Sequence, residues 1–165
     1  MIYQEIKEKC FVEEEELIFP LKYDEKIYAH IIIYPTDGFY LSEKQFKSIF
    51  NVLTKNDKIS AVYNVDIEFL KHGNRKINRK EILSYESYID TPILFENAIY
   101  DKNNVWSISI FMDFWGIFFA EKKILMELKK NYNYGIDLKD FEEMINKSEN
   151  KKVRNYFLEL IRKSY

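Results

Sequence analysis

Hydrophobic and polar positions along this chain predict strands in its first two thirds and helices in its last third. Residues 17–21 and 27–34 are short apolar runs, and residues 35–38 (PTDG) have the composition of a turn. Both faces of residues 27–34 are largely apolar, which is typical of a strand in the centre of a sheet. We therefore expect two early strands, the second of them central.

Strict alternation marks residues 59–70 as a strand with one apolar side and one polar side. The inward side would contain Ile59, Ala61, Tyr63, Val65, Ile67 and Phe69, and the outward side Ser60, Val62, Asn64, Asp66 and Glu68. Further strands are expected at residues 94–100, 105–112 and 116–120. The pattern predicts that the outward side of residues 59–70 faces water.

The stretch WSISIFMDFWGIFFAEKK, residues 106–123, is unusual because one carboxylate and one glycine interrupt a long apolar run. A transmembrane helix needs about 20 apolar residues, and this run is shorter and is broken at Asp113 and Gly116. We therefore expect a β-hairpin rather than a membrane segment. Residues 113–116 form its turn in this interpretation, with Gly116 available for a positive φ angle.

Helical periodicity appears in the middle of the chain and again throughout its last third. Residues 42–56 combine an apolar stripe with Ser42 and Gln45 at capping-box spacing. A second helical pattern begins at Glu121, Asp137 is expected to cap a third helix, and a fourth follows. These elements predict an α+β fold, in which residues 1–165 form a single domain. It would contain a mostly antiparallel sheet of about five strands, with helices packed on one side and a helical C-terminal third.

Charge is unevenly distributed along the 165 residues. The formal net charge of −2 does not indicate a general nucleic-acid binder. Residues 1–25 hold eight acidic residues against three lysines, a net charge of −5, whereas residues 121–165 hold eleven basic against eight acidic residues, a net +3. The single cysteine, Cys10, cannot form an internal disulfide, and the first residues lack a signal-peptide pattern. We therefore expect a cytoplasmic protein.

The acidic residues are the leading candidates for contact with a partner. The set consists of Glu13, Glu14, Glu15 and Glu16, together with Asp66 and Glu68 on the polar side of the predicted strand. Complementary charge raises the rate and selectivity of association, so a protein with a basic surface is the expected partner. The alternative is that these residues only keep the protein soluble.

A catalytic alternative uses Asp113, Glu121 and Lys123. A carboxylate on one strand followed by Glu-x-Lys on the next has the arrangement of PD-(D/E)xK nucleases, in which two acids hold Mg²⁺ and a lysine helps to activate water. The preceding Pro-Asp pair is absent here. Glu121 has a second interpretation as the first residue of a helix, where the helix dipole favours an acid.

The remaining candidates for chemistry have ordinary explanations. His30 is expected to be a hydrogen-bonded core residue, and neither it nor His72 lies at metal-ligand spacing from a second ligand type. There is no glycine-rich phosphate loop, and we expect no metal and no cofactor. A basic segment contains Lys71, Arg75, Lys76, Arg79 and Lys80. It is either a nucleic-acid contact or a solvated loop, and the second interpretation is favoured.

Residues 97–131, NAIYDKNNVWSISIFMDFWGIFFAEKKILMELKKN, resemble a pattern found in small bacterial immunity proteins of polymorphic toxin systems. That pattern is a strand with a tryptophan, a Trp-Gly hairpin turn, a strand and then a helix, and Trp106, Trp115 and Gly116 carry the similarity. The resemblance implies a non-enzymatic, cytoplasmic α+β protein that binds and neutralises a cognate toxin. It transfers no binding residue to this chain.

Overall fold

The structure is a computed structural model, and it describes only part of the chain. The described residues are 12–14, 17–19, 24–66, 75–77, 82, 84–91, 96–101, 103, 105–111 and 113–165. Predictions that concern Cys10, Glu15, Glu16, Glu68 and His72 therefore lie outside the described residues.

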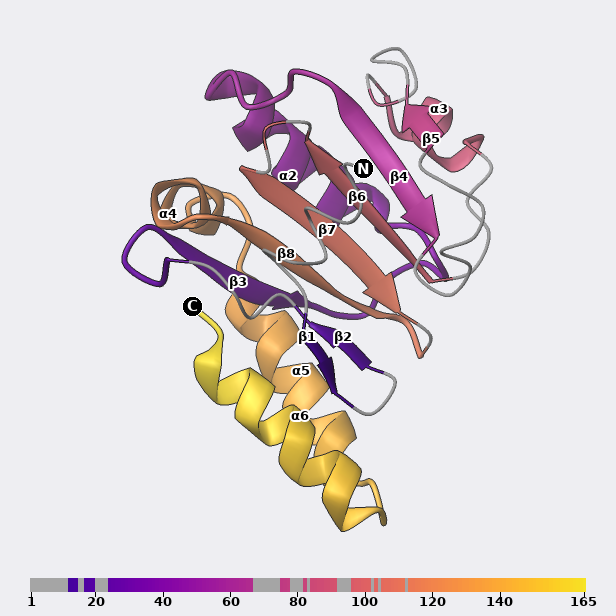
Figure 1. Ribbon diagram of the computed structural model, residues 1–165, viewed down its shortest axis with the longest axis vertical. Helices are drawn as coiled ribbons and strands as arrows, with labels where there is room; N and C mark the ends of the chain where they lie inside the picture. Colours follow the sequence, from indigo (N-terminus) through magenta and orange to yellow (C-terminus); the bar gives the residue numbers. More distant parts are fainter. Residues whose placement is uncertain are drawn as a thin grey trace.

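The centre of the fold is a six-stranded sheet in which every neighbouring pair of strands is antiparallel (Figure 1). Its strands are β3 (Tyr28–Ile33), β4 (Val62–Asp66), β5 (Arg75–Ile77), β6 (Asn97–Asp101), β7 (Trp106–Phe111) and β8 (Trp115–Glu121). They lie in the order β3-β8-β7-β6-β4-β5, and β1 (Val12–Glu14) pairs with β2 (Leu17–Phe19) in a separate two-stranded sheet. The predicted α+β class and antiparallel sheet are confirmed. The prediction that residues 27–34 form a central strand is wrong, because β3 lies at one edge.

Five helices complete the described fold, and three of them occupy the last third of the chain as predicted. They are α2 (Glu43–Lys55), α3 (Tyr85–Ile89), α4 (Lys122–Lys129), α5 (Tyr134–Asn146) and α6 (Lys151–Lys163). The predicted capping box at the start of α2 is confirmed. The backbone N–H of Gln45 donates to the Ser42 hydroxyl, and the Ser42 N–H donates to the side chain of Gln45 at 2.8 Å.

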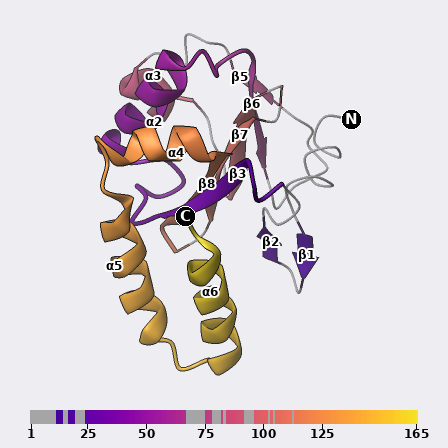
Figure 2. The same ribbon diagram turned by 90° about the vertical axis from the view of Figure 1, so that its left-hand side faces the viewer.

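Helices cover both faces of the sheet, not one face as predicted. One face packs against α2, α3 and α4, and the other packs against α5 and α6 (Figure 2). In β3, Ile31 and Ile33 belong to the first core and Ile32 belongs to the second. Strands that are apolar on both faces need cover on both faces, and this two-sided cover explains why β3 is largely apolar on both faces although it is an edge strand.

The polar side predicted for residues 59–70 is also covered. Val62 is 2% exposed and Asn64 is 8% exposed, although both were expected to face water. Val62 belongs to the core that includes α2, and the Asn64 side chain donates to the Asn97 side chain at 3.1 Å. A polar residue in a strand therefore does not establish that its face is exposed to water. An asparagine can be buried in a core when its side chain has a hydrogen-bond partner there.

Asp137 does not cap a helix, although the sequence predicts that it does. The N-cap of α5 is Asn133, and Asp137 lies inside the helix and is 7% exposed. Its carboxylate accepts hydrogen bonds from the backbone N–H of Tyr34 at 3.0 Å and from the Tyr132 hydroxyl. Asp137 thereby ties α5 to the segment that follows β3.

Candidate protein-binding surface at the hairpin end of the sheet

Strand pairing brings distant acidic residues to the same end of the sheet. The pairs align Asp66, Asn97, Ile110, Gly116 and Ile33 in one row across five strands. Beyond this row lie the loop 34–42, Glu96 and the turn that contains Asp113 and Phe114. We call Asp66 and these connections the hairpin end. Figure 1 shows the arrowheads of β4 and β7 pointing to this end. Neighbouring strands are about 4.8 Å apart, so the Cα atoms of Asp66 and Gly116 are separated by roughly 14 Å.

The charged residues of the hairpin end are carboxylates. They are Asp37, Asp66, Glu96 and Asp113. The described connections at this end, residues 34–42, 96 and 113–114, contain no lysine or arginine. The nearest described basic strand residue is Arg75, which pairs with Asn64 two positions inside the row. At the opposite end the described connections mix both signs, with Lys26 and Lys58 among their bases.

The β7–β8 turn projects an aromatic side chain from the hairpin end. Asp113 and Phe114 have φ angles of 69° and 62°, and the Phe114 side chain is 58% exposed. The backbone N–H of Thr36 donates to the Phe114 carbonyl at 2.8 Å, which links the turn to the loop after β3. Immediately behind the turn, the rings of Phe111 and Trp115 stack at 4.3 Å. The exposed Phe114 ring is therefore carried by a turn whose flanking residues, Phe111 and Trp115, are buried.

Positive φ was predicted at Gly116, and the structure places it at Asp113 and Phe114 instead. Trp115 and Gly116 are already in β8, where Trp115 pairs with Phe111 and Gly116 pairs with Ile110. Aspartate tolerates this backbone region, but a phenylalanine there is a genuine outlier. Sequence reasoning missed Phe114, because no local pattern indicated that an aromatic residue would take this conformation.

The other predicted partner-binding residues are only partly located. The backbones of Glu13 and Glu14 belong to β1, opposite Ile18 and Leu17 of β2. Asp66 is the last residue of β4, and the structure brings it to the same end as Asp113. Contact of the glutamate run and Asp66 with a partner stays a prediction.

The nuclease arrangement is contradicted by the length of β8. Asp113 precedes this strand and Glu121 ends it, and Trp115 and Glu121 are separated by six steps of about 3.3 Å, or roughly 20 Å. Two carboxylates that share Mg²⁺ must lie within about 5 Å of each other, given metal–oxygen distances near 2.1 Å. Glu121 instead pairs with Lys58 and Lys123, each at 2.7 Å. Asp113, Glu121 and Lys123 therefore do not form one metal site.

His30 is buried in β3, as predicted. It is fully buried, and its Nε2 lies 3.4 Å from the carbonyl oxygen of Leu160 in α6. Burial lowers the pKa of His30 to about 4, although the contact with Leu160 favours the charged form. The imidazole is therefore neutral near pH 7 and joins β3 to α6.

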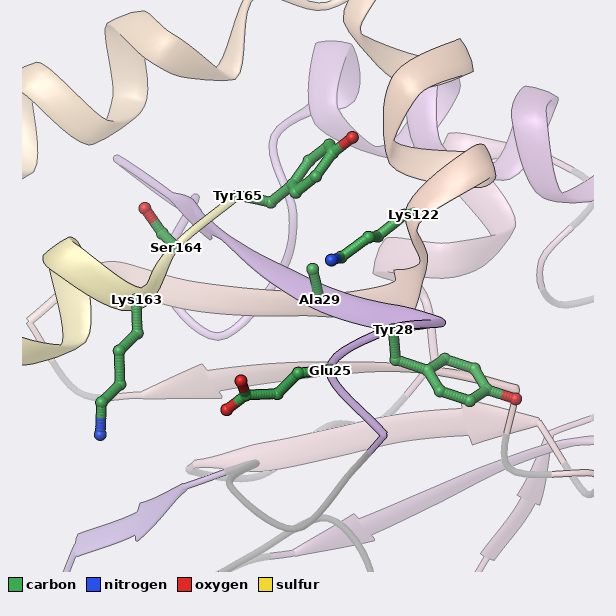
Figure 3. A pocket seen from close by; sticks show the side chains of 7 residues that line it. All are labelled: Glu25, Tyr28, Ala29, Lys122, Lys163, Ser164 and Tyr165. Carbon is green, nitrogen blue, oxygen red and sulfur yellow. The ribbon is translucent and has the colours of Figure 1, made fainter.

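A small pocket lies at the other end of β3, away from the hairpin end (Figure 3). It has a volume of about 290 Å³ and is lined by Glu25, Tyr28, Ala29, Lys122, Lys163, Ser164 and Tyr165. The Lys122 amine lies 5.9 Å from the centre of the Tyr165 ring. The Tyr165 N–H donates to the His30 carbonyl at 2.8 Å. These contacts cover the outer edge of β3, which would otherwise offer unpaired backbone groups.

The basic segment is described only in part. Arg75 and Lys76 belong to β5, which pairs with β4, while Lys71, Arg79 and Lys80 lie outside the described residues. Within the described part of the chain, no three histidine, cysteine or acidic residues gather as a possible metal site. None of the helices that the structure describes is long and apolar enough to cross a membrane.

Comparison with known proteins gives no family for this chain. No protein-family model matches it, and neither a curated protein nor a solved structure is significantly similar to it.

Proposed function

We propose that this chain is a protein-binding module, most concretely an immunity-type inhibitor that neutralises a cognate bacterial toxin in the cytoplasm. The observation that carries the proposal is the hairpin end, where Asp37, Asp66, Glu96 and Asp113 lie at the same end of the sheet. A partner with a basic surface matches this end. The glutamates at positions 13–16 and Glu68 would extend the acidic surface.

Two physical arguments support the proposal. Carboxylates on one side of a protein steer a basic partner toward that side and raise the association rate. Aromatic side chains are enriched at the centres of protein interfaces, and Phe114 is exposed beside Asp113. The resemblance of residues 97–131 to immunity proteins favours a toxin as the partner.

A binding assay against the protein encoded next to this one tests the proposal, because immunity proteins are encoded beside their toxins. Wild-type protein is expected to bind that product and to inhibit its toxicity in cells. Replacing residues 13–16, all glutamates, by lysine should slow association by one to a few orders of magnitude at low salt. The free energy of unfolding is measured in parallel and should change little if these charges act on association alone.

Two results would contradict the proposal in different ways. An absence of binding by the wild-type protein would remove the immunity function. An unchanged association rate in the lysine variant would exclude residues 13–16 from the interface and leave the binding function in place.

A further inference from the structure

We infer that Phe114 is the anchor of the interface: its ring enters an apolar pocket of the partner, and Asp113 pairs with a lysine or arginine at the rim of that pocket. The inference rests on the proposed function and names the part of the surface that holds the partner. Four features of the β7–β8 turn support it: exposure, backbone conformation, rigidity and charge.

Exposure distinguishes the Phe114 ring from the other aromatic side chains near it. Phe111 and Trp115 flank the turn and are 5% and 4% exposed, whereas Phe114 is 58% exposed. The Phe114 ring belongs to neither core of the sheet. Packing therefore does not require an apolar residue at position 114. Single exposed apolar side chains are common on protein surfaces, and the backbone conformation of Phe114 is what distinguishes this one.

The backbone of the turn is unfavourable for phenylalanine. At a φ of 62° the Cβ atom of an ordinary residue crowds its own backbone, and only glycine, asparagine and aspartate adopt this region readily. Asp113, at 69°, is a residue suited to this region, and Phe114 is not. Strained residues persist when the surrounding structure holds them, and they are common at ligand contacts. Folding alone would therefore favour asparagine or glycine at position 114.

The base of the turn fixes the backbone that carries the ring. Thr36, itself 7% exposed, donates its N–H to the Phe114 carbonyl at 2.8 Å. Trp115 packs against Phe141 of α5 at 5.2 Å between ring centres and against Phe157 of α6 at 5.3 Å. A group that is already ordered loses little entropy when it binds. The turn is thus a preorganised contact rather than a loop that must fold onto the partner.

The charges around the ring define the chemistry of the partner. Asp113 is adjacent to Phe114, and Asp37 follows Thr36, the residue that holds the turn. The Asp37 carboxylate accepts a hydrogen bond from the Tyr85 hydroxyl at 3.5 Å, so Asp113 is the carboxylate next to the ring. A ring with a carboxylate beside it fits an apolar pocket whose rim is basic. Anchors of this kind fill a pocket at the centre of the interface, while the charged rim sets orientation and association rate.

The test separates the role of the ring in binding from a role in folding. The variant Phe114→Asn removes the ring and places a residue suited to positive φ at this position. Its stability to urea should equal or exceed that of the wild type. Its affinity for the product of the adjacent reading frame should fall at least tenfold, mainly through faster dissociation. Phe114→Tyr, which keeps the ring, should bind within about threefold of the wild type.

A matched control is available on α4. Met126 is 59% exposed, nearly the same as Phe114, but lies in a regular helix that packs on one face of the sheet. Met126→Gln should leave the affinity unchanged. Equal affinity of Phe114→Asn and wild type would overturn the anchor and leave the proposed function standing. Reduced stability of Phe114→Asn would also overturn it, because the ring would then support the fold. No binding by the wild type would remove the proposed function and the anchor together.

Discussion

Gly116 lies so close to the backbone of Ser109 that a Cβ atom on Gly116 would come within 2.7 Å of the Ser109 carbonyl oxygen. The contact is to the backbone of an adjacent inner strand, and neither β7 nor β8 can move away without breaking its pairs. Glycine is required at this position because of the neighbouring strand. Backbone rotation at Gly116, which the sequence had suggested, is not the reason.

Substituting Gly116 by alanine should therefore destabilise the protein, by about 1–3 kcal/mol as in other overpacked cores. Equilibrium unfolding in urea measures this difference. Gly135→Ala in α5 is the control, since its Cβ would meet only the side chain of Asn133, at 3.2 Å. Alanine also favours a helix by up to about 1 kcal/mol over glycine. Similar stability of Gly116→Ala and wild type would show that the strands separate easily.

The free energy of unfolding should decrease at acidic pH because of His30. Its pKa is lowered to about 4 in the folded protein by burial, whereas an unfolded chain has a value near 6.5. The unfolded state therefore binds the proton more tightly. This part of the stability is present above pH 6.5 and is lost as the pH falls toward 4. The loss amounts to about 3 kcal/mol.

Urea unfolding at pH 7.5 and pH 4.5 measures the effect of His30. His30→Gln keeps a side-chain group that can contact the Leu160 carbonyl but cannot titrate. The free energy of unfolding of the wild type, relative to that of the variant, should therefore be lower at pH 4.5 than at pH 7.5. Lys163 lies near enough to disfavour the charged imidazole, and Lys163→Gln should make the loss slightly smaller. An unchanged difference between wild type and His30→Gln would mean that His30 is solvated in the folded protein.

Asp137 should give a pH dependence of the opposite sign. Burial raises the pKa of its carboxyl, although the hydrogen bonds from Tyr132 and Tyr34 oppose the shift. The folded state therefore binds this proton more tightly than the unfolded state. The contribution of Asp137 to stability is present below its unfolded pKa, near 3.9, and is lost as the pH rises through the raised value.

The variant Asp137→Asn isolates the Asp137 effect, because the amide keeps an acceptor for Tyr34 and carries no charge. Its stability relative to the wild type should increase as the pH is raised from 4 to 7, in urea unfolding experiments at several pH values. A relative stability that stays constant over this interval would show that the carboxyl titrates normally.

Sequence patterns predicted the elements that depend on neighbouring residues. The capping box of Ser42 and Gln45 is a local signal, and it identified the start of α2 correctly. A strand was also predicted at residues 105–112, and its alternate residues Trp106, Ile108 and Ile110 share one core. These elements can be predicted because the few neighbouring residues that form the pattern also determine the local structure.

Features that depend on distant residues were not predictable in the same way. Asn64 is polar, but it lies buried in β4 because its side chain donates a hydrogen bond to Asn97 on the neighbouring strand β6. Aspartate is a common helix-capping residue, but Asp137 lies inside α5. Its carboxylate accepts a hydrogen bond from the backbone N–H of Tyr34, more than a hundred residues earlier in the chain. The hairpin end arises from strand order, because only the pairing of β4 with β6 brings Asp66 to the end where Asp113 lies.

The association rate at two salt concentrations tests the proposed binding surface most directly. Asp37→Asn and Asp113→Asn together remove two charges from the hairpin end without changing shape, and asparagine tolerates the φ of 69° at position 113. We expect association with the product of the adjacent reading frame to slow by about tenfold at 0.01 M salt, where the Debye length is about 30 Å. The difference should shrink at 0.15 M, where that length is about 8 Å. Equal rates for the wild type and the double variant at both salt concentrations would show that the partner does not approach the hairpin end.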